Sequence, residues 1–127
     1  QGPHGARDLA TSATRGLGAA ILYTTYPDLG SAADAAAFDR LSRRVRLTRY
    51  GFDCYAYALL AAGHVDLVVE AGLQAYDVAA PIAVIEAAGG LVTDWQGGPA
   101  HGGGRVLAAA NAALHRQALA VLSEAQG

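Results

Sequence analysis

Three carboxylates are the best candidates for chemistry in this sequence: Asp53, Glu70 and Asp77. Asp53 and Asp77 each begin a predicted helix, and Glu70 ends a predicted strand over 65–70. In a layered α/β fold, ligands bind beyond the carboxyl ends of the strands, close to helix N-termini. We therefore expect all three carboxylates at one end of the sheet, whereas Asp66 should lie away from it. Such a trio suits a hard divalent cation, a polyhydroxyl compound or a cationic substrate, and it repels a bare phosphate.

Asp53 and Asp77 also have a purely structural interpretation. A carboxylate at a helix N-cap accepts hydrogen bonds from free backbone N–H groups and stabilises a protein by ~1 kcal/mol. On the residues alone, this capping role is favoured over a catalytic one.

Other candidate groups are weaker. Cys54 could act as a nucleophile with His64 as its base. If both residues belong to one helix, however, about ten positions separate them by about 15 Å along the helix axis. The glycine-rich stretches at 15–18 and 97–104 do not have the strand-to-helix context of a phosphate-binding loop. A single cysteine excludes a disulfide framework and a cysteine zinc cluster.

Short apolar strands that alternate with glycine-terminated helices must position these side chains. The alternation predicts an α/β fold, layered α/β/α, with a mostly parallel sheet of about five strands joined by crossover connections. The predicted strands cover 19–25, 45–50, 65–70, 91–95 and 105–109, and the predicted helices cover 31–44, 53–62, 77–88 and 112–124.

Length and composition limit the class of protein. The chain has 127 residues, of which 53% are hydrophobic and 16% are charged, with a net charge of −2. This suffices for one domain with a core, which we expect over 15–127 behind an arm or linker over 1–14. The small net charge gives no basic field for nucleic acid, and no apolar stretch reaches the ~18 residues of a membrane span. Because the start does not have the pattern of a secretory signal, the expected protein is soluble and cytoplasmic.

Several stretches resemble a known family. Residues 76–80 (YDVAA) and 86–94 (EAAGGLVTD) resemble the W/Y-D-x-A-A…E-A-G-G-x-x-T-D signature of the inositol monophosphatase superfamily. Within that superfamily, residues 49–66 and 20–25 resemble the histidinol-phosphate phosphatase branch. The resemblance runs over 11–122 and corresponds to the C-terminal half of such an enzyme. It implies the C-terminal half of the inositol monophosphatase-like fold.

The resemblance implies roles for the three carboxylates. Asp77 matches an Asp that ligates Mg²⁺ in the family, and Glu70 matches a Glu that contacts substrate hydroxyl or amine groups. Asp53 lies in the loop 51–53, which lines the substrate end of the pocket, and would meet the amino group or imidazole of histidinol. The expected substrate-binding residues are therefore Asp53, Glu70 and Asp77, with Asp77 also the expected metal ligand. Phe52 replaces the small residue expected in that loop.

Two further acids of the motif, Glu86 and Asp94, are expected to serve packing and the hydrogen bonds of a helix or turn. The family's other metal ligands come from a first-half Glu and from an Asp-Pro-Ile/Leu-Asp-Gly-Thr motif that this sequence does not contain. We therefore expect no complete catalytic machinery within these residues, and an inactive isolated chain. The sequence also contains no Met, so Gln1 is not an encoded start, and we expect a preceding segment.

The implied function is the C-terminal part of a Mg²⁺-dependent phosphatase. The full enzyme would hydrolyse L-histidinol phosphate to L-histidinol and phosphate in histidine biosynthesis, by attack of a metal-activated water on phosphorus. The implied partners are a small phosphate monoester, the missing N-terminal half and a second copy in a homodimer, with no nucleic acid and no membrane. Two alternatives stay open: a phosphatase for inositol or other sugar or nucleotide phosphates, and a non-catalytic module that keeps only this half.

Overall fold

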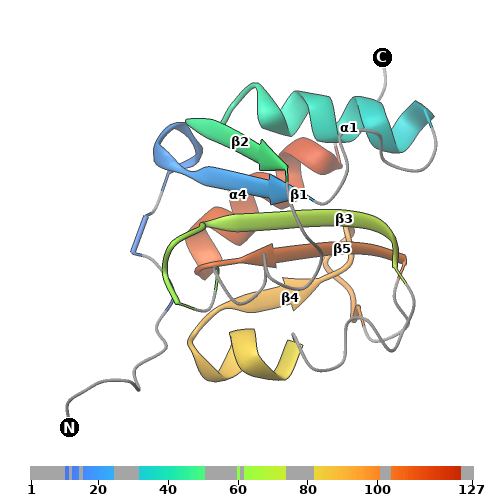
Figure 1. Ribbon diagram of the computed structural model, residues 1–127. Helices are drawn as coiled ribbons and strands as arrows, with labels where there is room; N and C mark the ends of the chain where they lie inside the picture. The colour runs from blue at the N-terminus through green and yellow to red at the C-terminus, as the bar shows by residue number, and fades with distance from the viewer. Residues whose placement is uncertain are drawn as a thin grey trace, which may run out of the picture.

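One five-stranded sheet organises the described part of the chain (Figure 1). The computed structural model describes residues 11, 13–14, 16–24, 32–50, 60, 62–73, 82–100 and 104–123. Residues 82–87 also form a helix, which is drawn without a label in Figure 1. The labelled elements are a 3₁₀ turn η1 (Leu17–Ala19), strands β1 (Ile21–Thr24), β2 (Leu47–Tyr50), β3 (Leu67–Leu73), β4 (Leu91–Thr93) and β5 (Gly104–Ala109), and helices α1 (Ala32–Ser42) and α4 (Ala112–Leu122).

The strand order is β2-β1-β3-β5-β4. β1 pairs in parallel with both β2 and β3, whereas β5 pairs antiparallel with both β3 and β4. The expected α/β fold is confirmed, but the expectation of a mostly parallel sheet is wrong, because the sheet is mixed. The reason is local: the described residues 94–100 between β4 and β5 contain no helix, and a connection without a crossover returns the chain antiparallel.

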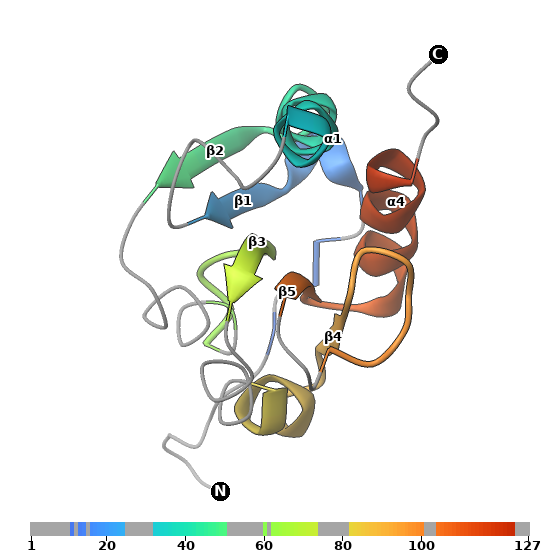
Figure 2. The same cartoon turned by 90° about the vertical axis from the view of Figure 1, so that its right-hand side faces the viewer.

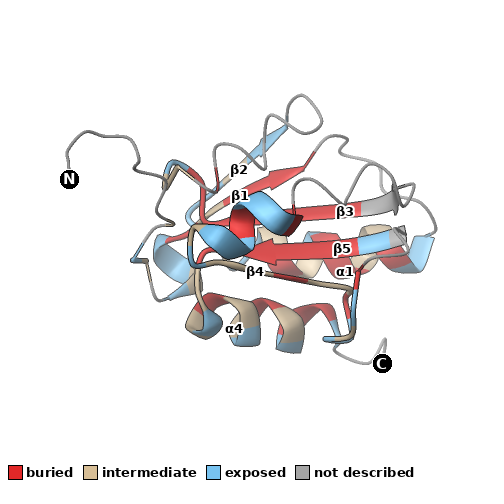
Figure 3. Ribbon diagram, turned by 90° about the horizontal axis from the view of Figure 1, so that it is seen from below, coloured by how far each residue is buried: buried red, intermediate tan, exposed pale blue. Residues whose placement is uncertain are grey.

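Helices cover both faces of this sheet. Figure 2 shows α1 and α4 on one face and the segment 82–87 on the other. The core is divided accordingly. One cluster joins α1 and α4 to alternate strand residues such as Leu22 and Leu107, and the other joins Ile82 and Ile85 to Val68 and Val106. Figure 3 shows most of β1, the described part of β3 and most of β5 buried, and the edge strand β2 largely exposed.

Two helix termini follow local sequence signals. Asn111 directly precedes α4 and is a residue type favoured at helix N-caps, and its Oδ1 accepts a hydrogen bond from the Leu114 N–H at 3.0 Å. Gly89 and Gly90 were expected to end a helix, and Gly89 has the left-handed φ of 106° that this requires. The Gly90 N–H donates to Ile85 O at 2.9 Å, which completes a Schellman motif. The predicted helix over 53–62 lies almost wholly outside the described residues.

Asp66 ties three strands together at the end of the sheet where β1 and β3 begin. Its Oδ2 accepts from the Ile21 N–H at 2.7 Å, and its own N–H donates to Ile21 O at 3.0 Å. Its carbonyl accepts from the Ala110 N–H at 2.9 Å, just after β5 ends. Asp66 is 5% exposed. It lies at the amino ends of β1 and β3, so the expectation that Asp66 lies away from the carboxyl ends of the strands is confirmed.

Candidate active site

Glu70 is the predicted site residue that the structure describes. It lies in β3, where its register partner is Val106 of β5. The pairing of β1 with β3 extends only as far as Tyr23 and Val68. Glu70 therefore lies beyond this paired region, near the carboxyl end of β1. The side chain is 3% exposed, and the residue takes part in a polar interaction. Burying a carboxylate is unfavourable without polar partners, and Glu70 has such an interaction.

A β-bulge follows Glu70 directly. The register passes from Glu70 opposite Val106 to Leu73 opposite Gly104, so β3 has one residue more than β5 in this interval. Bulges occur next to active sites because they redirect side chains, and a glycine such as Gly72 accommodates one. The sequence predicted that the strand ends before Ala71, which is wrong because the bulge continues the strand to Leu73.

The alternation of side chains along β3 determines the face of the sheet on which Glu70 lies. Side chains two apart point to the same side, so Glu70 lies on the side of Val68, which packs with Leu60 and Ile82. Leu60 and Ile82 directly follow the segments 51–59 and 74–81, which carry Asp53 and Asp77. Those two residues lie outside the described part of the chain. The described residues next to these two segments, Leu60 and Ile82, therefore pack on the same face of the sheet as Glu70.

The described residues do not hold a metal ion by themselves. Among them, no group of three or more His, Cys, Asp or Glu side chains could ligate one. Mg²⁺ requires about six oxygen ligands in octahedral geometry, which Glu70 cannot supply alone. The Mg²⁺ expectation therefore depends on Asp77, outside the described residues, and on oxygen ligands from further residues.

The other acids of the motif have structural surroundings. Asp94 Oδ1 accepts from the Gln96 and Gly98 N–H groups, both at 2.8 Å, and so closes the turn after β4. The expected turn role of Asp94 is thereby confirmed. Glu86 is exposed on the helical segment 82–87.

A polar cluster that sequence reasoning missed lies on the opposite face of the sheet, beside Glu70's strand partner. Arg105 Nη2 is 2.9 Å from Asp34 Oδ1, and the Arg105 guanidinium lies 5.7 Å from the centroid of the Trp95 ring. The Trp95 Nε1–H donates to Val106 O at 3.1 Å. Asp34 lies in the first turn of α1, far from Arg105 in the sequence, and no spacing rule pairs residues so far apart.

In the part of the chain that the structure describes, no helix combines the length and the apolar composition that crossing a membrane requires.

The sequence matches the model of the inositol monophosphatase family over residues 8–126. The chain belongs to the inositol monophosphatase family.

Curated relatives share this family. The chain is 51% identical over 90 residues to a protein named bifunctional phosphatase IMPL2, chloroplastic, from Arabidopsis thaliana, covering 71% of this chain and 26% of that protein. It is 37% identical over 84 residues to a histidinol-phosphatase from Streptomyces coelicolor, covering 66% of this chain and 31% of that protein. The chain therefore spans about a quarter to a third of the length of these relatives.

Solved structures of similar proteins share the fold. A structure of an inositol monophosphatase from Zymomonas mobilis matches with a TM-score of 0.87 and 40% identity, covering 91% of this chain and 47% of that one. A suhB protein from Bartonella henselae matches with a TM-score of 0.82 and 28% identity, covering 91% and 46%. The expected inositol monophosphatase-like α/β fold is confirmed, and the chain spans about half the length of these structures.

Proposed function

We propose that this chain is the C-terminal part of a Mg²⁺-dependent phosphatase that hydrolyses L-histidinol phosphate in histidine biosynthesis. Water is consumed, the phosphate ester bond breaks, and L-histidinol and inorganic phosphate are released. Family membership supports a phosphoric monoester hydrolase. The substrate is supported by the relatives named as histidinol-phosphatases, at 37% identity in Streptomyces coelicolor and 32% in Chlorobaculum parvum.

The observation that carries this proposal is the burial of Glu70 beside a bulge, at 3% exposure. L-histidinol phosphate has an amino group that is protonated at neutral pH. A carboxylate that is shielded from water attracts a cation more strongly than an exposed one, because screening is weaker. We assign Glu70 to the amino end of the substrate, where its buried carboxylate would attract the protonated amino group.

Asp53 and Asp77 complete the proposed site. Asp53 would face the imidazole or amine of the substrate, and Asp77 would ligate Mg²⁺ together with oxygen ligands from outside this chain. Support for a shared site is indirect: the described residues Leu60 and Ile82, which follow the two segments, pack in the cluster on the side of Glu70.

An inositol phosphate is the second candidate substrate. The 40% identity to an inositol monophosphatase from Zymomonas mobilis favours it. A buried carboxylate also accepts hydrogen bonds from the hydroxyl groups of a polyol, so Glu70 suits either ligand. The two substrates differ in charge: histidinol has a cationic group, whereas inositol has none.

Phosphate release by the purified full-length gene product tests the proposal. Initial rates would be measured with L-histidinol phosphate and with myo-inositol 1-phosphate, each with and without Mg²⁺. We expect Mg²⁺-dependent turnover and a kcat/KM at least about tenfold higher for L-histidinol phosphate, as a difference of about 1.4 kcal/mol gives. A preference for the inositol ester would support the second candidate. No turnover of either ester would contradict an enzymatic role and support a non-catalytic module.

The proposal includes the assembly and location of the protein. We propose that the full-length product is a cytoplasmic homodimer. Light scattering on the purified full-length product would give its mass, and the mass of a single copy at all concentrations would contradict the dimer.

A further inference from the structure

Arg105, Asp34 and Trp95 form a cluster on the face of the sheet that Glu70 does not share; we refer to these three residues as the Arg105 cluster. Strand alternation places Arg105 on the side of Leu107, which packs against α1 and α4. The ion pair between Arg105 and Asp34 is 2.9 Å long, and their side chains are 49% and 11% exposed. Trp95 is 5% exposed beneath the guanidinium.

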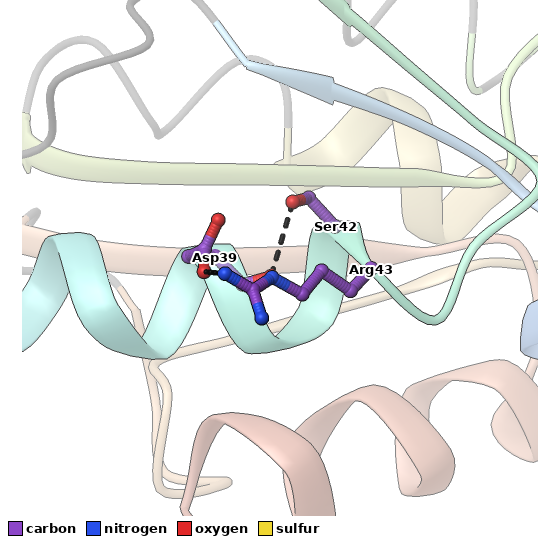
Figure 4. A network of polar contacts seen from close by, with 3 residues as sticks. All are labelled: Asp39, Ser42 and Arg43. Carbon is purple, nitrogen blue, oxygen red and sulfur yellow. Dashed lines mark hydrogen bonds and ion pairs between the residues drawn. The ribbon is translucent and has the colours of Figure 1, made fainter.

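A second arginine–aspartate pair provides a contrast. Arg43 Nη2 lies 2.9 Å from Asp39 Oδ2 (Figure 4), but these side chains are 78% and 55% exposed. Asp39 lies in α1 and Arg43 directly follows this helix, one turn later, so water screens the pair and the contact joins no distant elements. The pair between Arg105 and Asp34 instead joins the start of β5 to the first turn of α1 and encloses a nearly buried acid. The two ion pairs therefore have the same length, but only the pair between Arg105 and Asp34 joins two distant elements.

The Arg105 cluster is connected to Glu70 through the backbone of β5. Val106 follows Arg105 and is the register partner of Glu70. Its carbonyl accepts the Trp95 Nε1–H at 3.1 Å, while the same indole ring lies against Arg105. Trp95 thus holds two successive residues of β5. These residues lie opposite the point where the bulge interrupts the regular pairing of β3.

Trp95 itself is fixed by its neighbours. Its carbonyl accepts from the Ser123 hydroxyl at 3.3 Å, at the end of α4. The turn around it is closed by Asp94, which accepts from two backbone N–H groups. A fixed indole can define the position of β5, whereas a mobile one could not.

We propose that Arg105 is a positioning residue for Glu70. By its ion pair with Asp34 and its contact with Trp95, Arg105 fixes the start of β5, and β5 fixes the direction in which the bulged part of β3 presents the Glu70 carboxylate. The cationic end of the substrate then meets a carboxylate that is already oriented, which improves binding. This inference rests on the proposed function, since it assigns Glu70 to the substrate.

A double-mutant cycle in the full-length gene product tests the inference. The variants are Glu70→Gln, Arg105→Leu and their combination, with Arg43→Leu as the matched control, and the readouts are KM and kcat for L-histidinol phosphate. We expect each of the first two to raise KM roughly tenfold with kcat little changed, because a binding contact is lost. The double variant should be no worse than Glu70→Gln alone, since both changes remove the same contact. Arg43→Leu should leave KM unchanged.

The outcomes separate this inference from the proposed function. Independent effects, about a hundredfold in the double variant, would overturn the positioning role. An unchanged KM in Arg105→Leu beside a raised KM in Glu70→Gln would also overturn it, and would leave the proposed function intact. An unchanged KM in Glu70→Gln would contradict the proposed role of Glu70 and this inference together.

A milder variant keeps the test decisive if Arg105→Leu does not fold. Asp34→Asn keeps the shape of the side chain and removes the charge that Arg105 meets. We expect the same rise in KM and the same absence of additivity with Glu70→Gln. A loss of stability in urea with an unchanged KM would show that the Arg105 cluster supports only the fold, and would overturn the inference.

Discussion

At the scale of single residues, hydrogen bonding fixes the protons of His115 and Thr93. The Thr93 hydroxyl oxygen lies 2.7 Å from Asp94 O and 2.7 Å from His115 Nε2. A hydroxyl has one proton, which the Asp94 carbonyl accepts, so the His115 Nε2–H must donate to Thr93 Oγ1. Burial lowers the pKa of His115 below its ordinary value of 6.5, because the charged ring loses hydration. The neutral ring is therefore the form that suits this position.

The lowered pKa of His115 predicts that stability depends on pH. The unfolded chain binds the proton near pH 6.5, whereas the folded protein binds it only at lower pH. Between these values the unfolded state holds more protons, so the free energy of unfolding falls as the pH falls. The contribution is complete above pH 6.5 and is lost as the pH drops through the folded-state pKa. Urea unfolding from about pH 5 to about pH 8 should show this fall, and His115→Gln should reduce it. An identical pH dependence in the variant would contradict this role of His115.

At the scale of elements, Asn111 joins the start of α4 to the chain before η1. Its Oδ1 caps the helix through the Leu114 N–H, and its Nδ2 donates to Thr14 O at 2.8 Å. Asn111→Ala removes both hydrogen bonds and should lower the free energy of unfolding by about 1–2 kcal/mol. Asn111→Asp keeps the cap and loses only the donor, so its loss should be smaller. Equal losses in the two variants, measured by urea unfolding, would show that the cap contributes nothing.

The end of the helical segment 82–87 requires a glycine for space. A Cβ on Gly90 would lie 2.7 Å from Ala109 O and 2.7 Å from Ile85 Cγ2. We expect Gly90→Ala to lower the free energy of unfolding by about 1–3 kcal/mol, because the helix must move away from β5. Gly18→Ala is the control, since nothing lies within 4 Å of its added Cβ. Urea unfolding measures both, and equal stability of the two variants would contradict the close approach.

Elements whose signals are local could be predicted from the sequence, and contacts between distant residues could not. The Asn111 cap and the glycine stop at 89–90 depend on a few neighbouring residues, so their spacing predicts them. The pairing of β5 between β3 and β4 depends on long-range contacts, which periodicity does not record. The same holds for the site: Glu70 could be identified by its resemblance, but its bulge and the partner of Arg105 are set by the register of the sheet.

At the scale of the whole molecule, the chain corresponds to about half of a solved relative, 47% of the Zymomonas mobilis enzyme. The described residues contain no metal-ligating group of three or more side chains. We therefore expect the 127-residue chain alone to release no phosphate from L-histidinol phosphate at any Mg²⁺ concentration. A phosphate-release assay on pure chain, confirmed by intact mass, checks this, and Mg²⁺-dependent turnover would contradict it.

Asp77→Asn in the full-length gene product tests the central claim, that this chain contributes to a Mg²⁺-dependent phosphatase site. Asn caps a helix about as well as Asp, so a structural role alone would leave activity and stability unchanged. A Mg²⁺ ligand would lose the negative charge that the cation needs. We predict that phosphate release from L-histidinol phosphate falls by orders of magnitude and needs more Mg²⁺, with thermal unfolding in metal-free buffer unchanged. Full activity of the variant at ordinary Mg²⁺ would contradict the claim.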